Sequence, residues 1–164
     1  MLSKTPGKTN PAEPRGKVAE KRVATIAVRL SDAEVNRAPL AWGRRVARVV
    51  GAQMGVEMSL DRAKNEGTRG KTRVAIKCAK SRSAPIIVSQ AMLGRVKEVW
   101  GVFLVVGQGA EIWKCDAAFV RRAAYFNTTS QKMVRAELRF KAMQRGGTLI
   151  GHLSEAEVEA CEIP

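Results

Sequence analysis

Apolar and charged residues alternate strictly along residues 134–141. Successive side chains of a β-strand point to opposite faces, so this period of two predicts a strand, whereas helical spacing fits it badly. One face of the strand is expected to pack inward. The other face presents three positive charges and one negative charge, from Arg135, Arg139, Lys141 and Glu137.

Other segments predict further strands of the same sheet. Residues 56–61 and 72–79 also alternate between apolar and polar positions. Residues 99–106 are apolar on both faces, which is typical of a central strand. A turn at residues 107–109 leads into residues 110–115, an expected antiparallel neighbour, and residues 22–30 read as a strand near the N-terminus.

Capping signals predict the helices between these strands. Ser31 and Glu34 form a capping box, and Pro39 suits the first turn of a second helix. Further helices are expected to begin behind Ser89, Asp116 and Ser154. In the helix after Pro39, three arginines lie opposite the apolar positions, and a solvated face is the commoner explanation of such a stripe. These arginines are Arg44, Arg45 and Arg48.

The length and composition are those of one globular domain. The chain has 164 residues, of which 45% are hydrophobic and 27% are charged. Residues 1–21 are rich in Pro, Gly and Lys and predict a disordered basic arm. Residues 22–164 are expected to form a single domain of the α/β or α+β class, with a mixed β-sheet flanked by helices.

The net charge of +14 is the strongest compositional signal. Residues 1–22 carry six basic and two acidic residues, a charge of +4, and residues 154–164 carry −4, so the remaining body also carries +14. A charge of this size indicates a polyanionic partner, with nucleic acid ahead of a membrane surface. We expect DNA to be preferred over RNA.

Several classes of function are disfavoured by what the chain lacks. Its three cysteines are widely spaced and it has one histidine, so a disulfide framework, a zinc site and a Ser–His hydrolase are poor interpretations. The longest apolar run, residues 99–106, is too short to span a bilayer. A cytoplasmic location, with nucleoid association as an option, is expected. Aromatic residues make up 5% of the chain, which argues against a single-strand binder built on base stacking.

Residues 41–120 resemble the core of the restriction-endonuclease-like, or PD-(D/E)xK, nuclease superfamily. The resemblance rests on the order of elements: a helix, a strand ending in an acid, a loop, a strand ending in Lys77, a helix, an apolar strand and a strand containing "EIW". It implies a DNA endonuclease that uses one or two Mg²⁺ ions, an acid from the first strand, a second acid two residues before the lysine, and the lysine itself.

Carried over to this sequence, the resemblance implies catalytic roles for Asp61, Lys77 and Gln90. Ala75 stands where the second acid belongs, and the motif is degenerate there. Because Mg²⁺ usually takes one or two carboxylates in such sites, Glu66 or Glu57 would have to complete the metal site with Asp61. Lys77 would hold the phosphate or orient the attacking water as a point charge.

Basic residues around this core are the expected contacts to nucleic acid. They are Arg44, Arg45, Arg48, Lys64, Arg69, Lys71, Arg73, Lys80, Arg82, Arg135, Arg139 and Lys141.

Three alternatives stay open at this point. The first is a catalytically inactive DNA-binding relative of the same fold, whose site decayed at Ala75. The second is a transcription regulator, because residues 25–38 resemble the strand and first helix of ribbon–helix–helix repressors. The third is a basic RNA-binding protein. Because many nucleases of the resembled fold work as dimers, the resemblance is also compatible with a homodimer, and no segment of the sequence specifies its interface.

Overall fold

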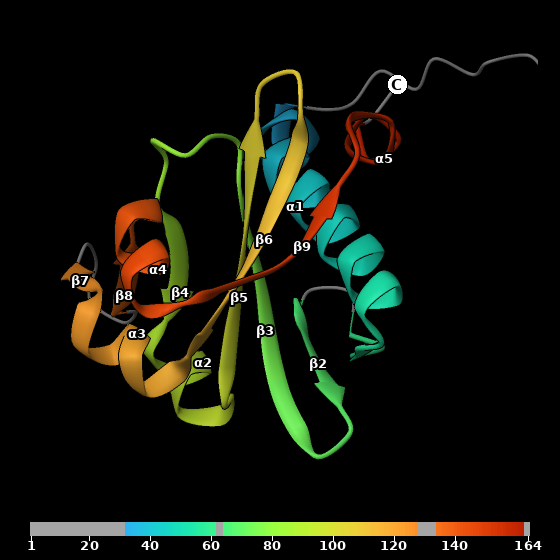
Figure 1. Cartoon of the computed structure of the whole chain (residues 1–164). Coiled ribbons are helices and arrows are strands. Elements are labelled where there is room, and N and C mark those ends of the chain that lie inside the picture. Colours follow the sequence, from blue (N-terminus) through green and yellow to red (C-terminus); the bar gives the residue numbers. More distant parts are fainter. Residues whose placement is uncertain (1–31, 62–63, 128–133, 163–164) are drawn as a thin grey trace, which may run out of the picture. The chain divides into compact units, whose positions relative to one another are not determined.

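The computed structural model of the chain describes residues 32–61, 64–127 and 134–162, with side chains from residue 41 onward (Figure 1). The predicted arm of residues 1–21, the strand of residues 22–30 and the capping residue Ser31 lie outside the described residues. Within the described part, the chain is an α+β unit with a six-stranded mixed sheet, a three-stranded sheet and five helices.

The large sheet is antiparallel except at its centre. Its strands, in spatial order, are β1 (Glu57–Met58), β2 (Glu66–Arg69), β3 (Thr72–Ala79), β5 (Glu98–Val105), β6 (Gly109–Asp116) and β9 (Thr148–Leu153). β3 and β5 are parallel. Parallel neighbours need a crossover connection, and here β4 (Ile86–Ser89) and α2 (Gln90–Arg95) provide it.

The small sheet has the order β4-β8-β7, where β7 is Tyr125–Asn127 and β8 is Arg135–Leu138. Both pairings are antiparallel. The remaining helices are α1 (Asp32–Met54), α3 (Ala117–Ala123), α4 (Phe140–Gly146) and α5 (Glu155–Glu159).

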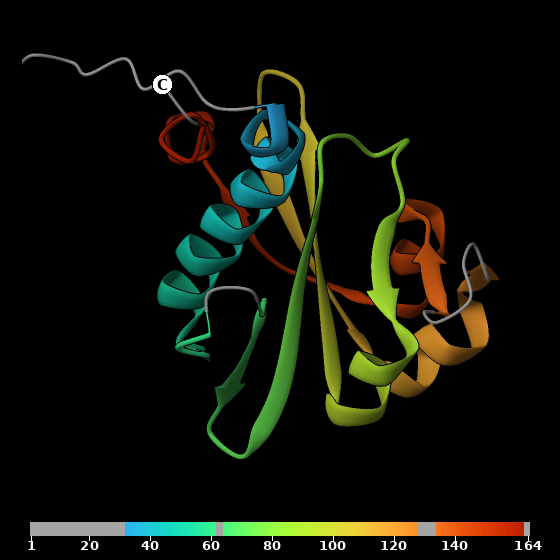
Figure 2. The same ribbon diagram turned by 180° about the vertical axis from the view of Figure 1, so that it is seen from behind.

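The two faces of the large sheet bury separate cores. Along β3, Val74 and Ile76 pack in the core covered by α1, while Ala75 and Ala79 belong to the core beneath α2, α3, α4 and the small sheet. Figures 1 and 2 show α1 on one side of the large sheet and the small sheet with α2, α3 and α4 on the other. The alternation of β3 therefore assigns the Lys77 side chain, between Ala75 and Ala79, to the α2 side.

The predicted strand over residues 134–141 is wrong beyond Leu138. β8 ends there, and α4 begins at Phe140. Phe140 and Met143 are both buried and are spaced by one helical turn, so this segment buries an apolar face as a helix. Strand and helix alike put Arg139 outside and Phe140 inside, and the alternation alone does not distinguish them.

Three other predicted boundaries also differ. α1 runs without interruption through Pro39, so no second helix begins there. The strand predicted over residues 56–61 is reduced to the two residues of β1, and the loop predicted after it contains β2. Residues 72–79, the helix behind Ser89 and the antiparallel strand after the apolar one are as predicted.

Candidate functional site

Lys77 shares one sheet face with two glutamates. Glu66 lies directly opposite Ala75 in the β2–β3 register, two residues from Lys77, and Glu57 lies opposite Thr68 in the next strand pair. Residues that face each other across antiparallel strands have Cβ atoms about 4.5–5.5 Å apart, and diagonal neighbours are within reach of long side chains. The structure therefore brings Glu66 and Lys77 together beside the alanine that replaces the second acid.

Glu66 is already held by a cation from α2. Arg95 donates from Nη2 to Oε1 of Glu66 at 2.6 Å and from Nε to Oε2 at 3.4 Å. Both carboxylate oxygens thus face one guanidinium, the two-pronged geometry that arginine favours. The same hydrogen bond raises the pKa of Arg95, which stays charged at any physiological pH.

Lys77 is half-buried, and burial lowers the pKa of its amine. The nearby thiol of Cys78 and the carboxylate of Glu66 favour the charged form and oppose this shift, but burial has the larger effect. Lys77 is thus a poorly solvated amine next to a carboxylate that an arginine also holds.

A pocket of about 350 Å³ opens beside these groups. Two acids and three cations line it, together with small polar residues. Its lining is Glu57, Ser59, Lys64, Glu66, Gly67, Thr68, Arg73 and Arg95.

Two of the predicted catalytic residues are not among those that line this pocket, although Asp61 pairs with Lys64, which does line it. Asp61 follows the short β1 strand in an exposed position, and its carboxylate is 3.3 Å from the amine of Lys64. Gln90 is an exposed residue at the start of α2. Neither lines the pocket that contains Glu57 and Glu66.

The residues of this pocket do not fit a magnesium ion. Among the residues that the structure describes, no group of three or more His, Cys, Asp or Glu side chains is arranged to hold a metal. Two glutamates share the pocket, and one of them, Glu66, already accepts hydrogen bonds from Arg95 on both carboxylate oxygens. Mg²⁺ needs oxygen ligands in near-octahedral geometry, and an arginine competes for the same lone pairs.

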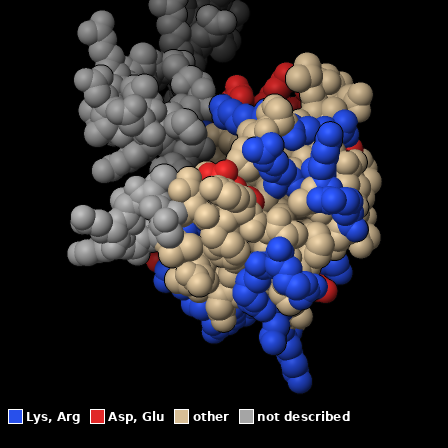
Figure 3. All heavy atoms as spheres, turned by 90° about the vertical axis from the view of Figure 1, so that its left-hand side faces the viewer, with Lys and Arg blue, Asp and Glu red and all other residues tan. Residues whose placement is uncertain are grey.

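A second candidate region lies over α3, β8 and α4, on the side of the large sheet away from α1 (Figure 1). Residues 117–127 and 134–147 contain six basic residues and one acidic residue, Glu137. Figure 3 shows Lys and Arg side chains outnumbering Asp and Glu on this side of the molecule. We call these six residues the basic face: Arg121, Arg122, Arg135, Arg139, Lys141 and Arg145.

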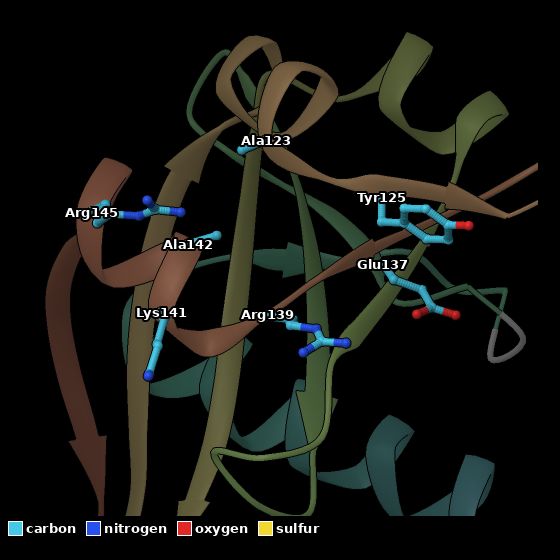
Figure 4. A pocket seen from close by; sticks show the side chains of 7 residues that line it. All are labelled: Ala123, Tyr125, Glu137, Arg139, Lys141, Ala142 and Arg145. Atoms are coloured by element: carbon cyan, nitrogen blue, oxygen red, sulfur yellow. The ribbon is translucent and has the colours of Figure 1, made fainter.

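The basic face contains a pocket of about 220 Å³. Three cations line it, with Tyr125 and Glu137 on the small sheet (Figure 4). The three cations are Arg139, Lys141 and Arg145.

Two of the arginines predicted to contact nucleic acid also donate hydrogen bonds within the protein. Arg45 donates to the backbone oxygen of Cys161, and Arg48 donates to that of Ser59 at 3.3 Å. These bonds support the structural interpretation of the α1 arginines. Arg44 is half-buried on the same helix.

Cations of the β2–β3 and β3–β4 connections lie against aromatic rings or acids. Arg69 stacks over Trp100 and Lys80 over Trp42, with 5.7 Å and 5.2 Å from the charged group to the ring centroid. Arg82 pairs with Glu111 and lies over Phe140. Lys71 and Arg73 are exposed, and Arg135, Arg139 and Lys141 belong to the basic face.

The sequence prediction missed four basic residues of these two regions. They are Arg95, Arg121, Arg122 and Arg145. Arg145 follows Lys141 by four residues, a helical spacing that the strand prediction for residues 134–141 concealed. Arg95 has no signal in the sequence, because only the fold brings it to Glu66.

Comparison with family models, curated proteins and solved structures found no match to the chain. In the described part of the chain, every helix is too short or too polar to cross a membrane.

Proposed function

We propose that the chain is a nucleic-acid-binding protein with DNA as its partner, and that the basic face makes the principal contact. The charge of this face carries the proposal. Three of the six cations surround one pocket, and the two segments that form this face hold a single acid, so the face attracts phosphates. Such contacts supply most of the sequence-independent affinity for nucleic acid.

The cations of the basic face are available to a ligand. Across the described residues, the ion pairs involve Lys64, Arg82, Arg95 and Lys114, none of which belongs to this face. Arg121 donates to the backbone oxygen of Leu93 and keeps its charge. Binding phosphate here would break no internal ion pair.

The arrangement of the large sheet supports DNA over RNA through the resemblance to restriction-endonuclease-like proteins. A helix, an antiparallel run of β1, β2 and β3, a crossover helix and a parallel strand β5 follow one another. Apart from β2 and β4, which the sequence did not predict, this order follows the one read from the sequence, and it supports a DNA-binding member or relative of that superfamily.

Fluorescence anisotropy with a labelled 30-base-pair duplex tests the proposal. The double variant Lys141→Gln/Arg145→Gln is compared with Arg69→Gln/Lys71→Gln, which removes the same charge from the β2–β3 hairpin. Log affinity should fall linearly with log salt, by roughly 0.9 per phosphate neutralised. The first variant should reduce this slope by about two, and the hairpin variant should leave it near the parent value.

Two results would reject the basic face as the interface. One is an affinity that does not change between low and moderate salt. The other is an equal loss in both double variants, or a loss confined to the hairpin variant.

A second candidate function is magnesium-dependent cleavage of DNA, as the resemblance implies. One observation favours it: Glu66 and Lys77 lie on one face of adjacent strands, and Glu57 lines the same pocket as Glu66. The arginine on Glu66 and the methyl group of Ala75 oppose it. We therefore expect binding without cleavage.

Plasmid nicking in Mg²⁺ distinguishes the two candidates. The parent protein should nick no more than Lys77→Ala, Glu66→Gln or Asp61→Ala, each assayed at a concentration that saturates binding. Nicking by the parent that is lost in Lys77→Ala and Glu66→Gln would establish the nuclease instead. A further loss in Asp61→Ala would return that residue to the site.

A further inference from the structure

The outer face of the small sheet carries an exposed aromatic ring within the basic face. Tyr125, the single tyrosine of the chain, has 71% of its surface exposed. It lies opposite Glu137 of β8, which in turn lies opposite Ile87 of β4. An exposed tyrosine ring bordered by cations offers stacking surface and charge at one place.

The pocket beside Tyr125 has two chemically different ends. In Figure 4, Arg145 and Lys141 lie at one end, Tyr125 and Glu137 lie at the other, and Arg139 lies between them. No salt bridge joins Glu137 to these cations among the described side chains. A phosphate is attracted to the cationic end and repelled by the Glu137 carboxylate, so the charges orient an incoming nucleotide.

The volume of the pocket lies between that of a site for a drug-sized ligand and that of a site for a lone ion. At about 220 Å³ it is smaller than the roughly 300–1,000 Å³ of pockets that enclose drug-sized ligands. It is larger than the space that a lone ion needs, which equals that of a few waters at about 30 Å³ each.

We propose that this pocket binds an unpaired nucleotide of a single-stranded nucleic acid, with its base stacked on Tyr125 and its phosphate on Arg139, Lys141 and Arg145. The inference rests on the proposed function and deepens it, because it names the form of nucleic acid that the basic face selects. Low aromatic content disfavours a platform for many bases, but one exposed ring suffices for one base.

A duplex does not satisfy both ends of the pocket. Base faces inside a duplex are covered by their neighbours, and a protein ring stacks only on a base that has left the stack. The cations alone would hold a duplex through its phosphates. Contact with the Tyr125 ring therefore distinguishes a single-stranded ligand from a duplex.

The single tyrosine makes this contact directly measurable. Protein labelled with ¹³C in the tyrosine ring gives signals from Tyr125 alone. A 12-nucleotide oligodeoxyadenylate should shift these signals upfield, because a stacked base shields the ring protons. A DNA dumbbell of 24 base pairs with closed ends should bind and leave them nearly unmoved.

Affinity measurements with matched variants complete the test. Tyr125→Leu should weaken the single-strand affinity by about five- to one-hundred-fold, as for other stacking aromatics, with little effect on the dumbbell. Tyr125→Phe keeps the ring and should keep the affinity. Arg145→Gln should weaken single-strand binding more than Arg122→Gln, which removes an equal charge from the basic face outside the pocket.

Ring signals that stay in place at saturating oligodeoxyadenylate, or that move equally with the dumbbell, would overturn the inference. Salt-dependent binding of the dumbbell would in that case leave the proposed function standing. Failure of both ligands to bind would reject both proposals.

Discussion

Lys77 illustrates how the surroundings of a residue change the properties that a motif implies for it. Its amine is half-buried between Ala75 and Ala79 on the α2 face of β3, and its nearest acid, Glu66, is bound by Arg95. Burial lowers the pKa of the amine, because removing the charged group from water costs free energy in the folded protein. At neutral pH the charged amine of Lys77 therefore lowers the stability of the folded protein.

The variant Lys77→Met should unfold less readily than the parent at pH 7, by on the order of 1 kcal/mol. The ordinary lysine pKa is 10.5, and the folded value lies below it. As pH rises between these two values, the folded parent releases a proton that the unfolded chain retains, so the parent gains stability. The advantage of the variant should shrink over this window.

Urea denaturation of both proteins from pH 7 to 10.5 measures the difference. Comparison with Lys71→Met, an exposed lysine in the neighbouring turn, controls for the general loss of one charge. A Lys77→Met protein that is less stable than the parent by the same amount at every pH would contradict a lowered pKa of Lys77 in the folded protein.

At the scale of elements, the β5–β6 hairpin holds the C-terminal segment against the large sheet. Gly109 begins β6 with φ +86°, and a Cβ there would lie 2.0 Å from the backbone oxygen of Leu153. Gly107, in the same turn, has φ +69° but open space around it. The two glycines share the left-handed conformation and differ in what surrounds them.

Gly109→Ala should therefore cost much more stability than Gly107→Ala. Both variants pay about 1–2 kcal/mol for a left-handed alanine. Gly109→Ala must also displace the backbone between β9 and α5, which adds the cost of overpacking, typically 1–3 kcal/mol. Thermal unfolding of the pair measures the difference. Equal losses of stability in the two variants would mean that the backbone between β9 and α5 shifts without an energetic penalty.

The whole molecule is a polycation whose charge is spread beyond one segment. Residues 1–22 account for +4 of the net +14, and the acidic residues of 154–164 offset an equal amount. Long-range attraction to nucleic acid depends on this total charge, whereas the mode of binding depends on the basic face.

A chain that begins at residue 23 should keep most of its salt dependence. The slope of log affinity against log salt should fall by a minority of its value, since the larger share of positive charge is retained. Anisotropy with the 30-base-pair duplex over a salt series measures both slopes. Loss of all binding on truncation would place the contact in residues 1–22 and not on the basic face.

The sequence was most informative where local pattern and environment agree. Strict alternation located β3 and the apolar run located β5. The helix predicted behind Ser154 is α5, and Ser154 forms a capping box there with Glu157. The sequence was least informative for β2, which has no apolar alternation and is stabilised by ladders to β1 and β3 on both sides. The switch from β8 to α4 was missed because both structures bury Phe140.

By itself, the sequence determined the charge, the mixed class of fold and the position of Lys77 on a strand, because these depend on composition and on local periodicity. Only the tertiary structure decided that Glu66 faces Ala75, that Arg95 occupies its carboxylate and that Tyr125 shares a pocket with three cations. These contacts join residues that are distant along the chain, or strands whose register the sequence does not reveal. The packing of the two cores brings the residues together.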